Sequence, residues 1–192
     1  MCGRLNIIDD RFSQFVSRQL GIAFYAAPNL DIRPSEQLQC IVASPEQVLF
    51  QFPLSWGIRT SWSSKLIINA QAETVSIKPT FQQAFALHRV VIPCSGWYEW
   101  SQGTSCAENK TKCSFYAADN SPLYMAAIGY PESKRVITLT TAPTQKYLRY
   151  HHRMPALLAA DSVSDWLNCN AREAEALLKS GLIRNAWTCR PA

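Results

Sequence analysis

The residue with the most unusual chemistry in this sequence is Cys2, which directly follows the initiator methionine. Methionine is normally removed when the second residue is small, so we expect the mature chain to begin with an α-amine and a thiol on one residue. The reference pKa values of these groups are about 8 and about 8.5, so both are available as nucleophiles near neutral pH. A 1,2-aminothiol of this kind converts an aldehyde first into an imine and then into a thiazolidine ring. The alternative is a terminal residue with no chemical role, as at most chain ends.

A second candidate is Glu99, which lies in the stretch VVIPCSGWYEW (residues 90–100) between three aromatic side chains. Aromatic neighbours can desolvate a carboxylate, which raises its pKa and suits it to carrying protons. On an alternating strand the same residue can instead point to solvent. The pattern alone leaves both interpretations open.

The third candidate stretch is YHHRMPALL (residues 150–158), which holds two adjacent histidines. Neighbouring residues on an extended segment point to opposite faces, so we expect only His151 to share a face with Arg153. A histidine here is either buried with its hydrogen bonds satisfied or part of a site and titrating near neutrality.

Short strands must position these residues. Apolar, β-branched or aromatic runs that read as strands cover residues 47–52, 65–69, 89–93, 97–100, 114–118, 123–129 and 135–141. Helical spacing is present at residues 11–20, after Asp9 or Asp10, and at residues 161–169 and 171–180, with Asp161 as a cap and Gly181 as a stop. Because long crossover helices do not alternate with the strands, we predict an α+β fold with a mainly antiparallel, barrel-like β core flanked by helices.

The overall composition is that of a globular protein. The chain has 192 residues, of which 47% are hydrophobic and 17% charged, so we expect one domain spanning residues 1–192. No apolar run approaches the ~20 residues of a membrane span, and the first segment soon turns polar. We therefore expect an intracellular, cytoplasmic protein that does not enter a membrane.

Cysteine number and net charge narrow the possible ligands. The seven cysteines are odd in number and show no CxxC or zinc spacing, so we expect no metal and no cofactor, with most thiols buried as small hydrophobes. The net charge of +5 favours an anionic partner such as nucleic acid.

Several motifs occur together in a fixed order. They are MCGR at the start, WGIRTSW at 56–62, NAQAET at 69–74, KPTF at 78–81, IPCSGWYEW at 92–100 and HHRMP at 151–155. This set resembles the SRAP (SOS response-associated peptidase) family over residues 2 to about 167. Members of that family attach covalently to abasic sites in single-stranded DNA through the N-terminal cysteine. The resemblance implies that Cys2 reacts with the aldehyde of the ring-opened sugar.

The resemblance also implies roles for individual residues. Cys2 would be the nucleophile, Asn69 would position the cysteine or the deoxyribose, Glu99 would shuttle protons, and His151 would be a second acid or base. Arg4 and Arg153 would hold phosphates. A self-processing peptidase activity that exposes the cysteine is implied as a secondary activity.

The sequence departs from the family pattern at two arginines. Gln71 and Gln82 replace them, whereas Arg59 and Arg33 stand where the family has other residues. We expect the DNA backbone to follow a shifted path contacted by Arg59 or Arg33; the alternative is weaker binding. Of the tryptophans, which are mostly core residues, Trp56 and Trp62 flank a basic loop and are the ones expected to stack on bases.

Two other function classes stay open. In an N-terminal-nucleophile amidohydrolase, Cys2 would attack an amide with its own amine as the base. In a non-catalytic single-strand-binding module, a retained Met1 would block the aminothiol. For the leading interpretation the partner is single-stranded DNA containing abasic sites, and the protein is expected to act as a monomer.

Overall fold

The computed structural model describes residues 3–100, 111–183 and 187–192. Its strands are β1 (Leu5–Ile7), β2 (Asn29–Ile32), β3 (Gln37–Ala43), β4 (Leu49–Trp56), β5 (Ile58–Thr60), β6 (Ser63–Ile67), β7 (Asn69–Gln71), β8 (Arg89–Cys94), β9 (Gly96–Trp100), β10 (Lys112–Ala117), β11 (Leu123–Tyr130), β12 (Arg135–Thr141), β13 (Met154–Pro155), β14 (Leu157–Leu158) and β15 (Trp187–Pro191). Its helices are α1 (Arg11–Leu20), α2 (Pro79–Leu87), the 3-10 turn η1 (Pro131–Ser133), α3 (Gln145–Leu148), α4 (Ser162–Asn168) and α5 (Ala171–Ser180).

The strands form two main sheets. Sheet A has the order β15-β10-β9-β1-β2, and all of its printed pairs are antiparallel. Sheet B runs β13-β12-β4-β3-β8-β11-β14, and the additional pairing of β11 with β12 makes its central strands follow one another in a ring. Only the pairs that β12 makes with β4 and β7 are parallel among the described strands. The predicted α+β class with mainly antiparallel pairing is confirmed.

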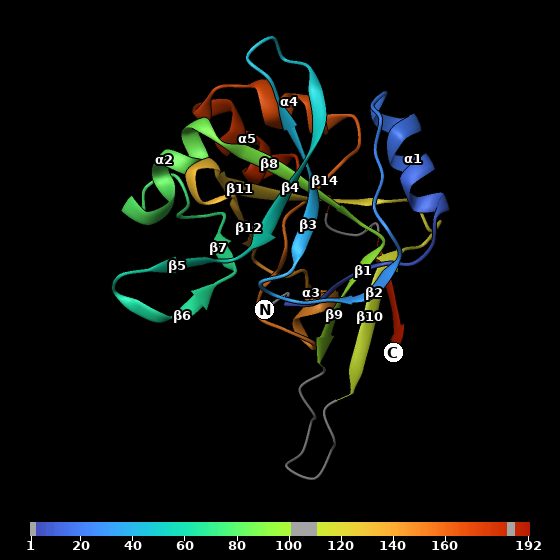
Figure 1. Cartoon of the computed structure of the whole chain (residues 1–192). Coiled ribbons are helices and arrows are strands. Elements are labelled where there is room, and N and C mark those ends of the chain that lie inside the picture. The colour runs from blue at the N-terminus through green and yellow to red at the C-terminus, as the bar shows by residue number, and fades with distance from the viewer. Residues whose placement is uncertain (1–2, 101–110, 184–186) are drawn as a thin grey trace.

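The two sheets meet where β8 passes into β9. The chain bends at Ser95, where it leaves sheet B and enters sheet A directly. A Cβ atom on Gly96 would clash with the backbone carbonyl of Phe115 on β10, so only glycine fits this close approach of two strands. Figure 1 shows β9, β10 and β15 extending downward from the ring of sheet B.

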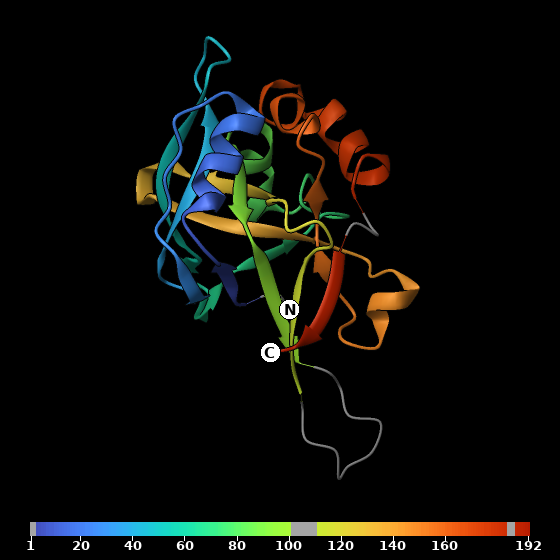
Figure 2. The same cartoon turned by 90° about the vertical axis from the view of Figure 1, so that its right-hand side faces the viewer.

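Helices cover sheet B, and Arg89 on β8 forms hydrogen bonds to two of them, α2 and α4. α2, α4 and α5 lie together at one side of the molecule, and α1 lies on the other side (Figures 1 and 2). The buried Arg89 guanidinium donates to the carbonyls of Phe85 (2.9 Å) and Ala86 (3.1 Å) in α2. It also donates to the carbonyls of Trp166 (2.7 Å) and Cys169 in and after α4. A cation is favourable at these positions because the last carbonyls of each helix carry partial negative charge.

An aromatic cluster holds α3 against sheet A. Trp97 stacks on Phe115 with ring centroids 5.0 Å apart, and Trp187 and Tyr147 complete the cluster. The Trp97 indole N–H donates to the Tyr147 hydroxyl at 3.1 Å, which satisfies the polar atoms of two buried rings. The short helix α3 is therefore anchored to β9 although it has only one turn.

Some sequence-based expectations require correction. The helix α2 was not predicted, because its short apolar stretch between polar residues resembles a loop; its Pro79 occupies the first turn, where proline is tolerated. Asp161 makes no side-chain bond to the backbone of α4, whereas Asp9 does accept from the N–H of Phe12 at the start of α1. Cys40, Cys94 and Cys113 are buried thiols, as expected. No helix among the described residues is both long and apolar enough to span a membrane.

Candidate active site

The register of β1 against β9 leads the start of the chain to Glu99. Leu5 pairs with Trp97 and Asn6 with Gly96, and the N–H of Tyr98 donates to the carbonyl of Arg4 at 3.0 Å. If the same antiparallel register continues toward the start of the chain, Gly3 lies beside Glu99. Cys2 itself lies outside the described residues.

Glu99 is a buried acid. It is 3% exposed, and this burial raises the pKa of its carboxyl group. Side chains two apart on a strand share a face, so Glu99 points to the same side of sheet A as Trp97. The paired residue on β10 is the buried Cys113, which adds no charge beside the acid. The expectation of a desolvated carboxyl group is confirmed, and the solvent-facing alternative is wrong.

The aromatic cluster brings His151 to the same face of sheet A. Tyr147 packs against Trp97 and accepts the backbone N–H of Tyr150 on its carbonyl at 2.9 Å. The backbone N–H of His151 also approaches that carbonyl, at 3.4 Å. The segment that carries His151 therefore folds over the side of β9 to which Glu99 points.

His151 is held as a neutral ring. Its Nδ1 accepts the backbone N–H of Arg153 at 2.9 Å, so the ring proton belongs on Nε2. Burial, together with neighbouring positive charge that includes His152, lowers the pKa of His151 to about 4. The two imidazoles stack with centroids 4.2 Å apart, which corrects the expectation that they point to opposite faces. The reason is that residues 151–153 form a bend before β13 and not a strand.

Asn69 enters from sheet B. β7 pairs in parallel with β12, which sets Asn69 opposite Thr138, and the Thr138 hydroxyl donates to the Asn69 carboxamide oxygen. This bond fixes which way the amide faces. Thr138 was not predicted as a site residue, although the alternating run RVITLTT places its hydroxyl on one face of the strand.

Arg153 is bound to the protein and forms a clamp. Its guanidinium donates to both Glu73 oxygens, at 3.1 and 2.6 Å, and to the carbonyl of Thr140 at 2.6 Å. Burial raises the pKa of Glu73, but the hydrogen bonds from Arg153 and from the N–H of Ala142 outweigh it and hold the pKa below its usual value. Arg153 thus ties β12 and the loop after β7 to the segment carrying His151, and its side chain is only 14% exposed.

Arg4 and Arg33 share one carboxylate. Arg4 donates to Asp31 at 2.5 Å, and Arg33 donates to the other oxygen of Asp31 at 2.9 and 2.6 Å. Hydrogen bonds from Arg4, and then from Arg33, lower the pKa of Asp31. Two arginines on a single carboxylate leave an excess of positive charge at the β1–β2 edge of sheet A.

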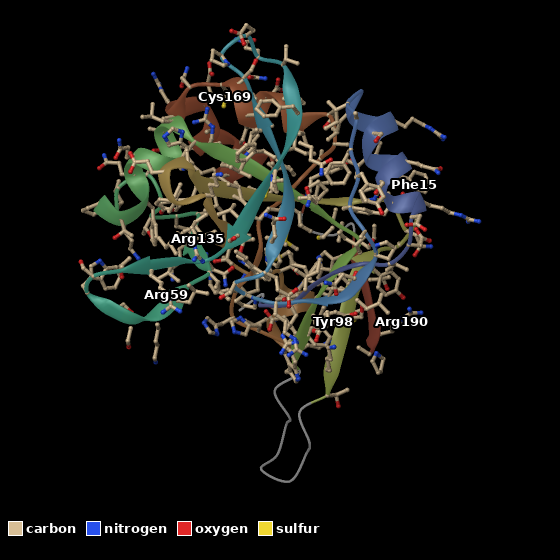
Figure 3. All side chains as sticks on the ribbon, viewed as in Figure 1. Phe15, Arg59, Tyr98, Arg135, Cys169 and Arg190 are labelled. Atoms are coloured by element: carbon tan, nitrogen blue, oxygen red, sulfur yellow. The ribbon has the colours of Figure 1, made fainter. Side chains whose placement is uncertain are left out.

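The β5–β6 hairpin projects from the body of the molecule and carries exposed groups of the kind that bind DNA. Arg59 is exposed and Trp62 is 67% exposed (Figure 3 labels Arg59 on this hairpin). Trp56 is instead fully buried, and its indole N–H donates to the carbonyl of Ile68 at 3.1 Å. The expectation that Trp56 stacks on a base is therefore wrong, because its ring belongs to the core.

The residues assembled here come from both sheets. Sheet A contributes Glu99 and the start of the chain, sheet B contributes Asn69, and the bend after α3 contributes His151. In the described part of the chain, no group of three or more His, Cys, Asp or Glu residues is arranged to hold a metal ion. A buried acid and a neutral imidazole can donate and accept protons around a reacting carbonyl group, and the oriented amide of Asn69 can form hydrogen bonds.

Solved structures share this fold. A phage-related protein from Bordetella bronchiseptica matches with a TM-score of 0.81 at 21% identity, over 100% of this chain and 94% of that one. A protein from Bacteroides thetaiotaomicron matches with a TM-score of 0.74 at 18% identity, over 99% of this chain and 91% of that one. These likenesses establish an α+β architecture shared over the whole chain.

The family follows from the sequence comparison. The profile of the SOS response associated peptidase (SRAP) family matches residues 1–190, so the chain belongs to that family, as its motifs predicted. It is 29% identical over 182 residues to the abasic site processing protein YoaM of Bacillus subtilis (strain 168), covering 88% of this chain and 79% of YoaM. It is 26% identical over 152 residues to the abasic site processing protein YedK of Escherichia coli (strain K12), covering 74% of this chain and 67% of YedK.

Proposed function

We propose that this protein processes abasic sites in single-stranded DNA by linking Cys2 covalently to the ring-opened sugar, after removal of Met1. The observation that carries the proposal is the β1–β9 register, which leads the first residues of the chain to the buried acid Glu99. Family membership and relatives named as abasic site processing proteins support the choice of substrate. Consecutive Cα atoms are about 3.8 Å apart, so the Cα of Cys2 can be no further than this from the Cα of Gly3.

The reaction joins one aldehyde and one aminothiol with loss of one water. The Cys2 amine adds to the C1′ carbonyl of the opened sugar to give a carbinolamine, whose hydroxyl group leaves as water after it receives a proton. The thiol sulfur then bonds to the carbon of the resulting iminium, whose nitrogen keeps its proton, and the thiol proton returns to the carboxylate that gave up the first proton. Holding the amine and aldehyde together supplies effective molarity that a free aminothiol lacks.

The named side chains fit the proton transfers. Glu99, with its raised pKa, donates the proton that lets the carbinolamine hydroxyl leave, and its carboxylate then accepts the thiol proton. His151 is neutral at pH 7 and offers its Nε2–H to the opened sugar as a hydrogen-bond donor. Asn69 positions the cysteine or the deoxyribose with an amide oriented by Thr138.

The remaining elements of the proposal concern binding and processing. Arg4 contacts a phosphate near the cysteine, Arg59 contacts one from the β5–β6 hairpin, and the exposed Trp62 stacks on an unpaired base. The protein acts as a monomer. Self-processing that removes leading residues and exposes Cys2 is a secondary peptidase activity.

The test is a denaturing gel of the protein with a single-stranded oligonucleotide that carries one abasic site, together with an intact mass of the same preparation. We expect a shifted band that forms without reductant and is absent in the Cys2→Ala variant. A sample whose mass shows that Met1 is gone, and which gives no band, would refute covalent capture and favour the amidohydrolase alternative.

A further inference from the structure

Sheet A has a second face, turned away from α3, which we call the outer face. Trp97 and Phe115 point toward α3, so the alternate residues on β9, β10 and β15 point the other way. The outer face carries Tyr98, which is only 8% exposed, the half-buried Tyr116 and the exposed Arg190. No helix of the described chain lies over it in Figures 1 and 2, and Figure 3 shows Tyr98 and Arg190 near one another at the lower end of the molecule.

A continuous row of residues crosses the outer face from strand to strand. Arg4 on the β1 side bonds through its carbonyl to Tyr98, Tyr98 pairs with Ser114, and Ser114 pairs with Arg190. Asp31, which binds Arg4, extends the row to β2. Four strand spacings of ~4.8 Å give the row a length of about 19 Å.

Cations stack on aromatic rings along this face. The Lys112 ammonium lies 3.9 Å from the centroid of Tyr98, and the Arg190 guanidinium lies 5.2 Å from the centroid of Tyr116. Within the described residues, neither Lys112 nor Arg190 forms a salt bridge, so both charges are available to an anion. Arg190 is exposed, and its planar guanidinium is supported from below by the tyrosine ring.

The charge balance of the row is positive. Lys112, Arg190, Arg4 and Arg33 bring four positive charges, and Asp31 is the single carboxylate bound to them in the described chain. The middle residue of the row is Tyr98 on β9, whose ring lies under the Lys112 ammonium, and the row has no aliphatic side chain of the kind that forms the apolar centre of a protein interface. Cations supported by aromatic rings on the face of a sheet are instead the features that bind single strands without sequence preference.

We propose that the outer face of sheet A is a second contact surface for single-stranded DNA, which holds the strand on one side of the reactive cysteine. Lys112 and Arg190 contact phosphates, and the stacked pair of Arg190 and Tyr116 supports an unpaired base. The row begins at Arg4, three residues from Met1, so a strand bound at the cysteine can continue onto this face. The inference rests on the proposed function only in taking single-stranded DNA as the ligand.

The experiment measures the salt dependence of binding to an undamaged single-stranded oligonucleotide, so that no covalent step contributes. The double variant Lys112→Ser/Arg190→Ser is compared with the wild-type protein and with Lys179→Ser, which removes a 79% exposed cation from the remote helix α5. The logarithm of the binding constant falls linearly as log salt rises. Loss of two phosphate contacts should make this slope less steep by about 1.4, at about 0.7 per contact on single strands. The charge-preserving double variant Lys112→Arg/Arg190→Lys should keep the wild-type slope.

The outcomes separate this inference from the proposed function. A slope unchanged in the double serine variant, or lowered to the same extent by Lys179→Ser, would overturn the outer face as a DNA surface. If the slope falls as expected while wild-type protein forms no covalent band with an abasic oligonucleotide, the surface stands and covalent capture fails. If the band forms but the slope does not change, covalent capture stands and the surface is refuted.

Discussion

Glu99 shows how one buried side chain can set the chemistry of the site. A carboxyl group at 3% exposure resists ionisation, and the pairing of its strand with β1 brings it to the start of the chain. A protonated acid is what the departure of water from a carbinolamine requires. The environment of this residue therefore matches the step that we assign to it.

Replacing Glu99 by glutamine should slow covalent capture by about 100-fold, because the amide cannot donate the proton that general acid catalysis supplies. In the wild-type protein the rate should fall as pH rises through the raised pKa of Glu99, and this limb should vanish in the variant. Single-turnover crosslinking rates across a pH series measure both effects. Glu132→Gln, at an exposed glutamate, is the matched control, and an unaltered rate in Glu99→Gln would exclude the assigned role.

His151 should make folding stability depend on pH. In the folded protein the pKa of His151 is lowered from 6.5 to about 4. Between these pH values His151 is therefore protonated in the unfolded chain and neutral in the folded chain. Its contribution to stability is thus complete above pH 6.5 and is lost as the pH falls to about 4. Urea unfolding at several pH values should show a shallower decline for His151→Asn than for wild type. An equal decline in both would contradict the lowered pKa.

At the scale of elements, Arg89 joins helices to sheet B through carbonyl groups alone. Arg89→Met keeps the apolar stem but leaves carbonyls of α2 and α4 without their donor. Because buried unsatisfied carbonyls are costly, we expect a loss of about 3 kcal/mol in the free energy of unfolding. Urea unfolding should show a lower midpoint at an unchanged m value. Arg172→Met, at an exposed position of α5, should lose far less, and equal losses would show that the carbonyl contacts do not stabilise the fold.

The β5–β6 hairpin is the element expected to define the shifted DNA path. Arg59→Ala should lower the salt slope of single-strand binding by about 0.7. Arg33→Ala should lower it less, because the Arg33 guanidinium is already bound to Asp31. Trp62→Ala should weaken binding by about 1 to 3 kcal/mol through loss of base stacking. A slope that stays at the wild-type value in Arg59→Ala would exclude the hairpin from the DNA path.

At the scale of the whole molecule, the site depends on how the two sheets are joined. Glu99 belongs to sheet A and Asn69 to sheet B, and the clamp made by Arg153 connects sheet B to the segment that folds over sheet A. We therefore expect Arg153, together with the pairing of β13 with β12, to set the relative placement of the two halves of the site. We predict a positioning role for Arg153, as an alternative to the phosphate contact implied by the family resemblance.

Arg153→Lys distinguishes these two roles. Lysine keeps the charge but cannot donate to both Glu73 oxygens and to Thr140 with one planar group. A positioning role predicts crosslinking slowed by about 10-fold with an unchanged salt slope for undamaged single strands. A direct phosphate contact predicts that Arg153→Ala lowers that slope by about 0.7, which would contradict the clamp.

The family and the α+β class follow from the sequence alone, which also singles out candidates for the reactive residues. Motif order and residue chemistry are local properties, and they sufficed to single out Cys2, Asn69, Glu99 and His151. The long helices α1 and α5 were also predicted, because the helical spacing of their apolar residues can be recognised within one continuous segment.

Tertiary structure alone decided the environment of each group. Glu99 is buried on the face of β9 against which α3 packs, and Trp56 is buried with its indole N–H bonded to Ile68. Both environments join segments that local periodicity cannot relate. The partners of Arg153 and Arg33 are likewise carboxylates and carbonyls whose positions only the folded chain fixes. The sequence shows which charged residues are present. Their neighbours in the folded protein decide whether each charge can bind DNA.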